Sequence, residues 1–346
     1  MELKGDAAEP EMRFLRLREL IGRRPFKPPF WLRGGVRQTV AASYVKRDFR
    51  WGWKQSSRVS IELADRSRVE PDCVQQSETA PTVVLFHGMG GSSASTYMRG
   101  LSHKAFRQGW NAVSMNLYNT NPSLEFPKIF HAGASQDAGQ ILEKLADRHP
   151  SKAFYLAGVS MGANLVLKLL GEWGNDPPVQ VGGAAVISPL LDLSSSLEVL
   201  ERRSNALFQR HFMGKFRRHI RERADQLRPF VDVESVLRVR SIREFDEKLT
   251  APLSGFKSAS EYYEKASALP YLKRVRVPTL LVHALDDPLL PPEPLVLGEP
   301  SNPFLESVLT DRGGHVGFLE RDRSADVDRF WAENRVVDFF RICEES

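Results

Sequence analysis

The stretch that decides the fold reads FYLAGVSMGANLVLKLLGEWG and covers residues 154–174. It starts as the short apolar run of a buried strand and ends as an apolar helix, with a G-x-S-x-G motif at residues 158–162 between them. A strand-to-helix turn of this kind strains its central residue, here Ser160, and leaves no room for side chains at Gly158 and Gly162. A random chain of this length contains the motif about one time in ten. The motif alone is therefore not sufficient, and the prediction that Ser160 is a nucleophile depends on the strand and the helix that flank it.

The same rhythm of strand, turn and helix extends along most of the chain from residue 81 onward. Strands are predicted at residues 82–86, 111–117, 153–159, 181–188, 279–285 and 306–310, and helices at 96–109, 135–149, 163–174 and over a C-terminal stretch with Val327, Phe330, Trp331, Val337 and Phe340. Strands that alternate with helices predict an α/β fold, in which a mostly parallel central sheet is flanked by helices on both faces.

Two parts of the chain depart from this alternation. Residues 190–268 have the pattern of helices and loops, and about 80 residues are too many for a bare connection. We therefore expect a helical cap inserted into a domain of residues 81–346. Residues 1–80 are expected to form an N-terminal extension whose first strands pack on that domain. Within it the sequence predicts an amphipathic helix at 10–23, a loop at 26–35, a strand at 58–65 and an exposed loop at 66–81.

A serine nucleophile needs a base and a carboxylate that orients the base. His315 lies in a glycine-rich loop, residues 313–317, before the C-terminal helix. Asp287 follows the strand predicted at 279–285 and precedes a proline, while Asp286 is adjacent, and the sequence does not choose between the two. The order serine, acid, histidine, with each residue after a predicted strand, is the order of α/β-hydrolases and differs from both common serine-protease orders.

A second glycine-rich turn, HGMGGSS at residues 87–93, follows the first strand of the domain. Such a turn could cradle a phosphate or present backbone N–H groups to a reacting carbonyl oxygen. It matches neither G-x-G-x-x-G nor a P-loop, because its last position is serine and no Gly-Lys-Ser/Thr follows. We therefore predict an oxyanion loop, in which Gly88 allows close approach and the backbone N–H groups of Met89 and Met161 are the donors. His87 is expected to be structural.

The composition narrows the choice of partners. The 48 basic residues exceed the 43 acidic ones by a net charge of only +5. Cys73 and Cys343 lack metal-type spacing, which predicts unpaired thiols in a reducing, cytoplasmic compartment. The N-terminus has no apolar secretory segment, and no apolar run approaches the ~20 residues that cross a bilayer. Because His211 and His219 have no third ligand nearby, we expect no metal site, and nothing indicates another cofactor.

The basic stretch of residues 202–228 has two interpretations. Its aromatic and aliphatic residues recur every four positions, at Phe208, Phe212, Phe216 and Ile220, whereas Arg and Lys fill the other faces. We favour a cap helix that packs its apolar stripe on the core and leaves its basic face in solvent. The alternative is peripheral contact with an anionic membrane surface. Nucleic-acid binding is not expected, because no recognised binding module accompanies the charge.

Several segments between residues 26 and 320 carry a resemblance to a known family. They are FKPPFWLRGGVRQT, HGMGGSSASTYMRGL, GVSMGANLVLKLLGE, SIREFDEKLTAPLSGFKSASEYY, VPTLLVHALDDP and GGHVGF. With these segments the chain resembles the YheT-like branch of the α/β-hydrolases, which is related to ABHD-type lipid hydrolases and to EMB8-type plant proteins. The resemblance implies a serine hydrolase of carboxylic esters, with Ser160 as nucleophile, Asp287 as acid and His315 as base.

Two positions depart from the pattern of that family. Val36 replaces the histidine of an N-terminal Gly-His-x-Gln-Thr motif, and Tyr118-Asn119-Thr120 stand where the family commonly has an Arg-Gly-Cys-like turn. The resulting hypothesis is a carboxylesterase or lipase-like enzyme that cleaves short-chain or lipid acyl esters by two-step acyl transfer. The alternatives are a thioesterase or amidase with the same three residues, and a non-catalytic ligand-binding protein on the same fold.

Overall fold

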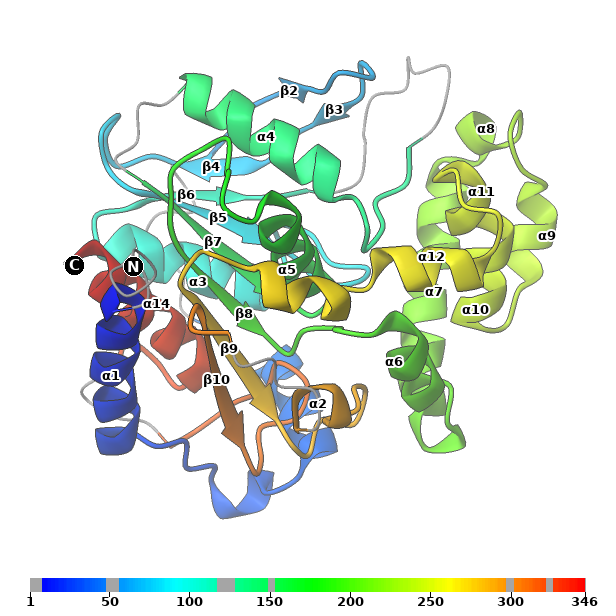
Figure 1. The fold of residues 1–346 in the computed structure, drawn as a ribbon. Coiled ribbons are helices and arrows are strands. Elements are labelled where there is room, and N and C mark those ends of the chain that lie inside the picture. The colour runs from blue at the N-terminus through cyan, green and yellow to red at the C-terminus, as the bar shows by residue number, and fades with distance from the viewer. Residues whose placement is uncertain are drawn as a thin grey trace.

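The computed structural model describes residues 8–47, 56–116, 128–148, 153–296, 302–321 and 326–345. An eight-stranded sheet crosses its centre in the order β1-β4-β6-β5-β7-β8-β9-β10, with a separate β2–β3 pair beside it (Figure 1). The strands are Ser57–Arg58 (β1), Ile61–Glu62 (β2), Arg68–Val69 (β3), Asp72–Val74 (β4), Thr82–Phe86 (β5), Asn111–Ser114 (β6), Phe154–Val159 (β7), Val181–Ile187 (β8), Thr279–Ala284 (β9) and Leu305–Thr310 (β10).

The central sheet is parallel from β6 to β10 and antiparallel at one end, where β1 pairs with β4 and β4 pairs with β6. In the middle, Val84 of β5 pairs with Val113 of β6 on one side and with Leu156 of β7 on the other. Successive strands after β5 therefore lie on opposite sides of it. In sheets of this kind, ligand sites form outside the carboxyl ends of the strands at such a reversal. The mostly parallel sheet predicted from the sequence is confirmed.

Helices cover both faces of the sheet (Figure 1). One face packs against α1 (Ala8–Arg23), α3 (Thr96–Arg107) and α14 (Trp331–Glu344), and the other against α4 (Ser135–Arg148) and α5 (Met161–Trp173). The strands between them carry apolar side chains on both faces, which explains why their sequences are continuous rather than alternating. The C-terminal helix begins at Trp331, so Val327 of the predicted helix lies before it.

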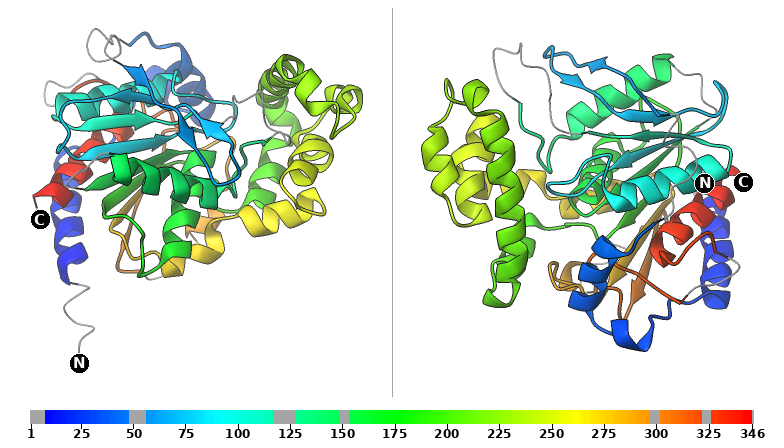
Figure 2. Two further views of the ribbon diagram at one scale, coloured as in Figure 1. Left: turned by 90° about the horizontal axis from the view of Figure 1, so that it is seen from above. Right: turned by 180° about the vertical axis from the view of Figure 1, so that it is seen from behind.

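Helices fill the stretch in which the sequence predicts a cap, and they project to one side of the sheet (Figure 2). The segments from β8 to β9 are α6 (Leu193–Leu200), η3 (Arg203–Asn205), α7 (Ala206–Glu222), α8 (Ala224–Leu227), α9 (Val233–Arg238), α10 (Ile242–Phe245), a π-helical turn η4 (Asp246–Thr250), α11 (Ala251–Leu253), α12 (Ala259–Ala266) and η5 (Leu269–Arg274), and α13 (Glu293–Val296) follows β9. The cap has its own apolar core, which includes Met213, Phe216 and Ile220 of α7, with Phe208 and Phe212 packed against it. The apolar stripe of residues 202–228 therefore faces the inside of the cap, as the favoured interpretation expected.

The N-terminal extension differs from its prediction. The single strand expected at 58–65 is divided between β1 and β2, which belong to different sheets. The exposed loop expected at 66–81 contains β3 and β4, and all three residues of β4 are buried. The polar sequence of this segment is typical of an exposed loop, but Asp72 can be buried because its carboxylate accepts hydrogen bonds from Ser93 and Arg58. After a 3-10 turn, η1 (Phe30–Leu32), the chain forms α2 (Gly35–Tyr44), a helix that the sequence pattern does not predict.

Both cysteines are buried and unpaired. Within the described ranges, no helix combines the length and the apolar character that a membrane span requires.

Candidate active site

Ser160 stands in the turn between β7 and α5, at the carboxyl end of the central strands. Its backbone has φ 57° and ψ −118°, which is a strained conformation for a residue with a side chain. A Cβ at Gly158 would lie 2.4 Å from the carbonyl oxygen of Gly162, and a Cβ at Gly162 would lie 2.3 Å from that of Phe86. Both distances are too short for any side chain. The two glycines are therefore required by the close approach of backbone to backbone, which raises Ser160 above the sheet.

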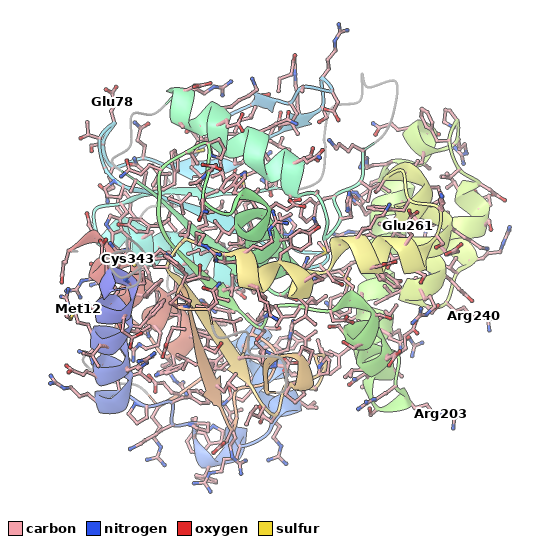
Figure 3. All side chains as sticks on the ribbon, in the orientation of Figure 1. Met12, Glu78, Arg203, Arg240, Glu261 and Cys343 are labelled. Carbon is pink, nitrogen blue, oxygen red and sulfur yellow. The ribbon has the colours of Figure 1, made fainter. Side chains whose placement is uncertain are left out.

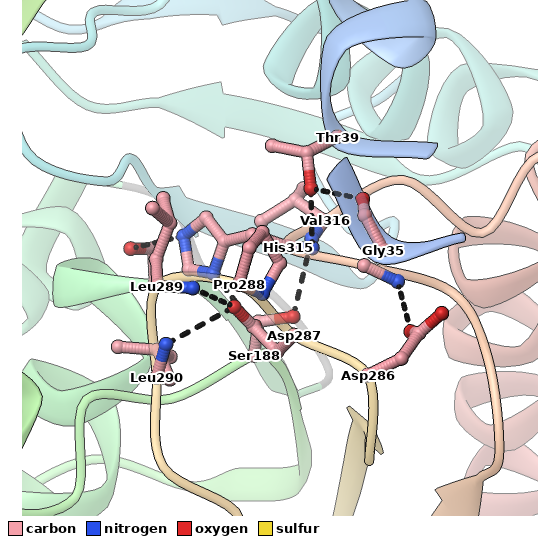
Figure 4. A network of polar contacts seen from close by, with 12 residues as sticks. Gly35, Thr39, Ser188, Asp286, Asp287, Pro288, Leu289, Leu290, His315 and Val316 are labelled. Carbon is pink, nitrogen blue, oxygen red and sulfur yellow. Dashed lines mark hydrogen bonds and ion pairs between the residues drawn. The ribbon is translucent and has the colours of Figure 1, made fainter. Parts of the chain in front are cut away.

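The structure brings His315 and Asp287 to Ser160. The Nε2 atom of His315 is 2.9 Å from the Ser160 hydroxyl oxygen, and its Nδ1 atom is 2.8 Å from Oδ2 of Asp287. The other oxygen of Asp287 accepts hydrogen bonds from the backbone N–H groups of Leu289 and Leu290, at 2.8 and 3.1 Å (Figure 4). These bonds fix a fully buried carboxylate in the position that orients the imidazole.

The neighbouring Asp286, which the sequence left as an alternative, turns away from the imidazole. Its carboxylate accepts a hydrogen bond of 2.8 Å from the backbone N–H of Gly314 instead. Burial raises the pKa of this carboxyl, although the N–H donors of Gly314 and Gly313 act in the opposite direction. Asp286 thus touches the loop that carries His315, whereas Asp287 touches the imidazole itself.

The loop that carries His315 is strained. Val316 has φ 60° and Phe318 has φ 43°, conformations that side chains rarely adopt and that cost roughly 1–3 kcal/mol each. Such strain persists only where the surroundings hold the backbone in place. The end of β8 provides one such support, because the hydroxyl of Ser188 accepts a hydrogen bond of 3.2 Å from the Val316 N–H.

Helix α2 provides the other supports, although it lies some 270 residues earlier in the chain. The Thr39 hydroxyl accepts a hydrogen bond of 2.8 Å from the His315 N–H and donates one of 2.8 Å to the Gly35 carbonyl (Figure 4). The fully buried Gln38 donates to the Leu319 carbonyl and accepts from the Leu319 N–H. The side chains of Thr39 and Gln38 thus bond to the backbone before and after the strained residues of the loop, at His315 and at Leu319.

None of these supports follows from the sequence pattern, because a polar residue on a short helix is usually exposed. One signal was present. The segment RGGVRQT belongs to the family resemblance, and its Gln38 and Thr39 match the family motif, whereas its substituted position, Val36, is an exposed side chain. The other noted departure, Tyr118-Asn119-Thr120, lies outside the described residues.

The glycine-rich loop after β5 reaches Ser160 from the other side. A Cβ on Gly88 would lie 3.0 Å from the Ser160 Cβ, so the loop passes very close to the hydroxyl. In the described part of the chain, the backbone N–H groups of Met89 and Met161 have no hydrogen-bond acceptor. Both N–H groups are therefore available to a ligand. His87 is fully buried, its Nδ1 lies 2.8 Å from the Gly88 carbonyl oxygen, and burial lowers its pKa to about 4. It is therefore neutral near pH 7 and holds the loop, as expected.

Two pockets meet at Ser160. The first lies between the sheet and the cap and encloses about 980 Å³, its opening to solvent included. Apolar side chains dominate its lining, among them Leu197, Leu200, Phe216, Ile220 and Leu249. The second opens between α2 and the first turns of α7 and is more polar. Ser160, His315, Met89, Phe212 and Leu289 border both pockets. An extended ligand could therefore lie with one end in each pocket and its middle at the Ser160 hydroxyl.

A polar cluster interrupts the lining of the first pocket at the π-helical turn of the cap. The carboxyl of Asp246 accepts hydrogen bonds from the hydroxyls of Thr250 and Tyr263, at 2.7 and 2.9 Å. Burial raises its pKa to about 6, and the two hydroxyl donors only partly oppose that shift. π-Helical turns occur often at functional sites. This one lies in the segment REFDEKLTAPLSGF, which forms part of the family resemblance.

His211 and His219 both lie on α7, but they border different pockets. Among the described residues, no three side chains of His, Cys, Asp or Glu lie together in a way that could hold a metal ion.

Comparison with known proteins places this geometry in a family. The family model Hydrolase_4, described as serine aminopeptidase S33, matches residues 77–297. The YheT protein of Escherichia coli K12, to which esterase activity is attributed, is 31% identical over 277 residues, which cover 78% of this chain and 79% of YheT. Phospholipase ABHD3 of Homo sapiens is 30% identical over 271 residues, which cover 75% of this chain and 66% of ABHD3. The EMB8 protein of Picea glauca is 26% identical and covers 99% of this chain and 80% of its own.

Solved structures agree on the fold. The esterase Pf2001 of Pyrococcus furiosus superposes with a TM-score of 0.55 at 18% identity, over 86% of this chain and 94% of its own. Est1E of Butyrivibrio proteoclasticus superposes with a TM-score of 0.54 at 13% identity, over 84% of this chain and all of its own. At such low identities the likeness concerns the fold alone. Together, the parallel sheet, the strained serine turn and the matches in sequence show that the chain belongs to the YheT-like branch of the α/β-hydrolase family.

Proposed function

We propose that this protein is a serine hydrolase that cleaves carboxylic esters, with small-molecule or lipid acyl esters as substrates. The observation that carries the proposal is the continuous chain of contacts from Asp287 through His315 to Ser160, at the point where the two pockets meet. The relatives whose names state an activity include a phospholipase and a monoacylglycerol lipase of Saccharomyces cerevisiae. Both names point to ester bonds of lipids.

In the proposed reaction, the Ser160 oxygen attacks the ester carbonyl while Nε2 of His315 takes its proton. The Asp287 carboxylate holds the imidazole in the required tautomer through Nδ1 and stabilises the imidazolium that forms. The carbonyl oxygen becomes an oxyanion, which the N–H groups of Met89 and Met161 stabilise. His315 then gives its proton to the leaving alkoxide. Water attacks the acyl-enzyme by the same route and releases the acid, so that no cofactor takes part.

The two pockets support a division of the substrate. The apolar pocket under the cap suits the acyl chain, because burial of hydrocarbon there is favourable by about 25 cal/mol per Å². The more polar pocket between α2 and α7 then receives the alcohol part. On this assignment, acyl length is selected by the apolar lining under the cap, and the alcohol is selected by residues of α2 and the first turns of α7.

A fluorophosphonate probe that reacts with activated serines tests the nucleophile. We expect the wild-type chain to label and Ser160→Ala not to label. Ser235→Ala should label like wild type, because this serine lies in the cap, where its hydroxyl accepts a hydrogen bond from Lys248. An unlabelled wild type, or labelling of Ser160→Ala at the wild-type rate, would refute the proposal and favour a ligand-binding role on this fold.

The ester assignment has its own test. Esters of graded acyl length are compared with thioester and amide analogues of the same acyl group, using unlabelled protein from a preparation that the probe has shown to be active. We expect the highest kcat/KM for esters. Higher values for amides would favour a peptidase of the kind that the family model's description names, and higher values for thioesters would favour a thioesterase.

A further inference from the structure

Exposed apolar side chains surround the mouth of the second pocket. Val36, Val40 and Tyr44 lie one helical turn apart along the outer face of α2, with exposed fractions of 53, 43 and 82%. Leu207, at the start of α7, is 79% exposed and borders the same pocket. We call these four residues the entrance surface. Phe30 and Trp31, which precede α2 and contact each other, are also exposed.

The inner face of α2 packs against the rest of the protein, whereas its outer face carries exposed apolar side chains without such a contact. Gln38 is buried against the His315 loop, and Thr39 bonds to that loop. A helix so firmly anchored on one side normally carries polar residues on the other. Contiguous apolar side chains with a polar surrounding mark sites of contact with a protein or a membrane.

The two chain segments that supply the entrance surface carry charged side chains of a single sign. Residues 26–47 and 202–215, which supply the entrance surface, contain nine Lys or Arg and no Asp or Glu, although the whole chain has 43 acidic residues in 346. The basic residues are Lys27, Arg33, Arg37, Lys46, Arg47, Arg202, Arg203, Arg210 and Lys215. Arg47 is paired with Glu333. The other eight form no ion pair with an acidic side chain among the described residues.

We propose that the entrance surface docks on an anionic lipid bilayer, with Val36, Val40, Tyr44 and Leu207 entering the headgroup region and the surrounding basic residues contacting lipid phosphates. Apolar side chains flanked by Lys and Arg bind such surfaces by burial of hydrocarbon and by attraction to anionic headgroups. The contact therefore involves α2 and the start of α7. The apolar stripe of α7, in contrast, packs into the core of the cap and does not take part in the contact.

The docking step rests on the proposed function and adds a route for the substrate, because the second pocket leads from the entrance surface to Ser160. A lipid ester could pass from the bilayer into the pocket without crossing water. The docking itself does not depend on hydrolysis, so it can be measured in a chain that lacks the nucleophile.

The test measures binding of the Ser160→Ala chain to sedimented vesicles of phosphatidylcholine, with or without an equal part of phosphatidylglycerol. We expect binding to the anionic vesicles, weakened by salt. Adding Val36→Ser, Tyr44→Ser and Leu207→Ser should reduce the partition coefficient at least tenfold. The matched control, Met12→Ser with Leu15→Ser, removes apolar side chains that are 61 and 48% exposed on α1, and it should change binding less than twofold. Figure 3 shows Met12 at one side of the molecule and Arg203 of the cap at the other.

Charge is tested in the same way. Arg203→Gln with Arg210→Gln should weaken binding to anionic vesicles and reduce its salt dependence, whereas Arg238→Gln with Arg240→Gln, elsewhere on the cap, should not. Since all these side chains are exposed, melting temperatures should stay unchanged. The proposal is overturned if the chain does not bind anionic vesicles, or if the control variants lose as much binding as the entrance variants. A dimer in lipid-free solution that the entrance substitutions dissociate would assign the surface to a second copy of the chain instead.

Discussion

Replacing Thr39 by valine tests whether α2 is part of the catalytic apparatus. Valine has nearly the shape of threonine and the same branching at Cβ, so the helix is preserved while the hydroxyl is lost. The His315 N–H then loses its acceptor at 2.8 Å. A donor left without a partner in a partly buried position costs about 1–3 kcal/mol. The loop that must absorb this change already holds Val316 and Phe318 at positive φ.

If the whole of that energy falls on the placement of the imidazole, the rate should drop about 5- to 150-fold, because 1.36 kcal/mol corresponds to a factor of ten. We expect the loss in kcat and in the rate of fluorophosphonate labelling, with KM little changed. Thr39→Ser keeps the hydroxyl and should recover most of the activity. Unfolding in urea checks that both variants are folded at the assay temperature. The reasoning is wrong if Thr39→Val retains the wild-type kcat, or if Thr39→Ser is impaired as strongly as Thr39→Val.

Four further substitutions test other parts of the site. Asp287→Asn should lower kcat on the order of 10⁴-fold because it favours the wrong tautomer of His315. Asp286→Asn should lower kcat less than about tenfold, because its amide oxygen can still accept a hydrogen bond from the Gly314 N–H. Equal losses of kcat in steady-state assays would contradict the assignment of Asp287. Gly162→Ala should prevent accumulation of folded protein, since its Cβ would lie 2.3 Å from the Phe86 carbonyl oxygen, and a normal melting curve would disprove the steric argument. Asp246 has a pKa raised from 3.8 to about 6 in the folded chain, so its contribution to stability is present at low pH and is lost as the pH rises through that range. The free energy of unfolding of Asp246→Asn, minus that of wild type, should therefore rise by roughly 2 kcal/mol between about pH 4 and pH 7. Urea unfolding at both values decides the point, and a difference independent of pH would show that Asp246 does not titrate in this way.

The sequence predicted well what depends on local pattern. The strands and helices around Ser160 were visible because a buried parallel sheet makes its strands uniformly apolar and its crossover helices periodic. The serine turn was visible because glycine is the only residue that fits its two close approaches. Ser160, Asp287 and His315 could be proposed together from their order after successive strands, and the structure brings them within hydrogen-bond distance.

The failures have physical reasons too. The sequence predicts a loop where strand β4 lies because Asp72 is polar, and only the structure shows the Ser93 and Arg58 partners that make the burial of its carboxylate tolerable. The choice between Asp286 and Asp287 depends on which side of a turn each carboxylate leaves, and no spacing reports that. Thr39 escaped notice because its partner is 276 positions away.

That last separation has a consequence for how the protein matures. The loop with His315 reaches its working shape only when α2 meets a segment that lies 276 positions later in the chain. Contacts between such distant positions close the longest loops in the chain, and they are slow to form because the entropy of closure precedes any gain. A chain in which the sheet and the serine turn have formed but α2 has not docked should therefore lack activity. Recovery of activity after denaturation should therefore follow the docking of α2 as well as the formation of the sheet.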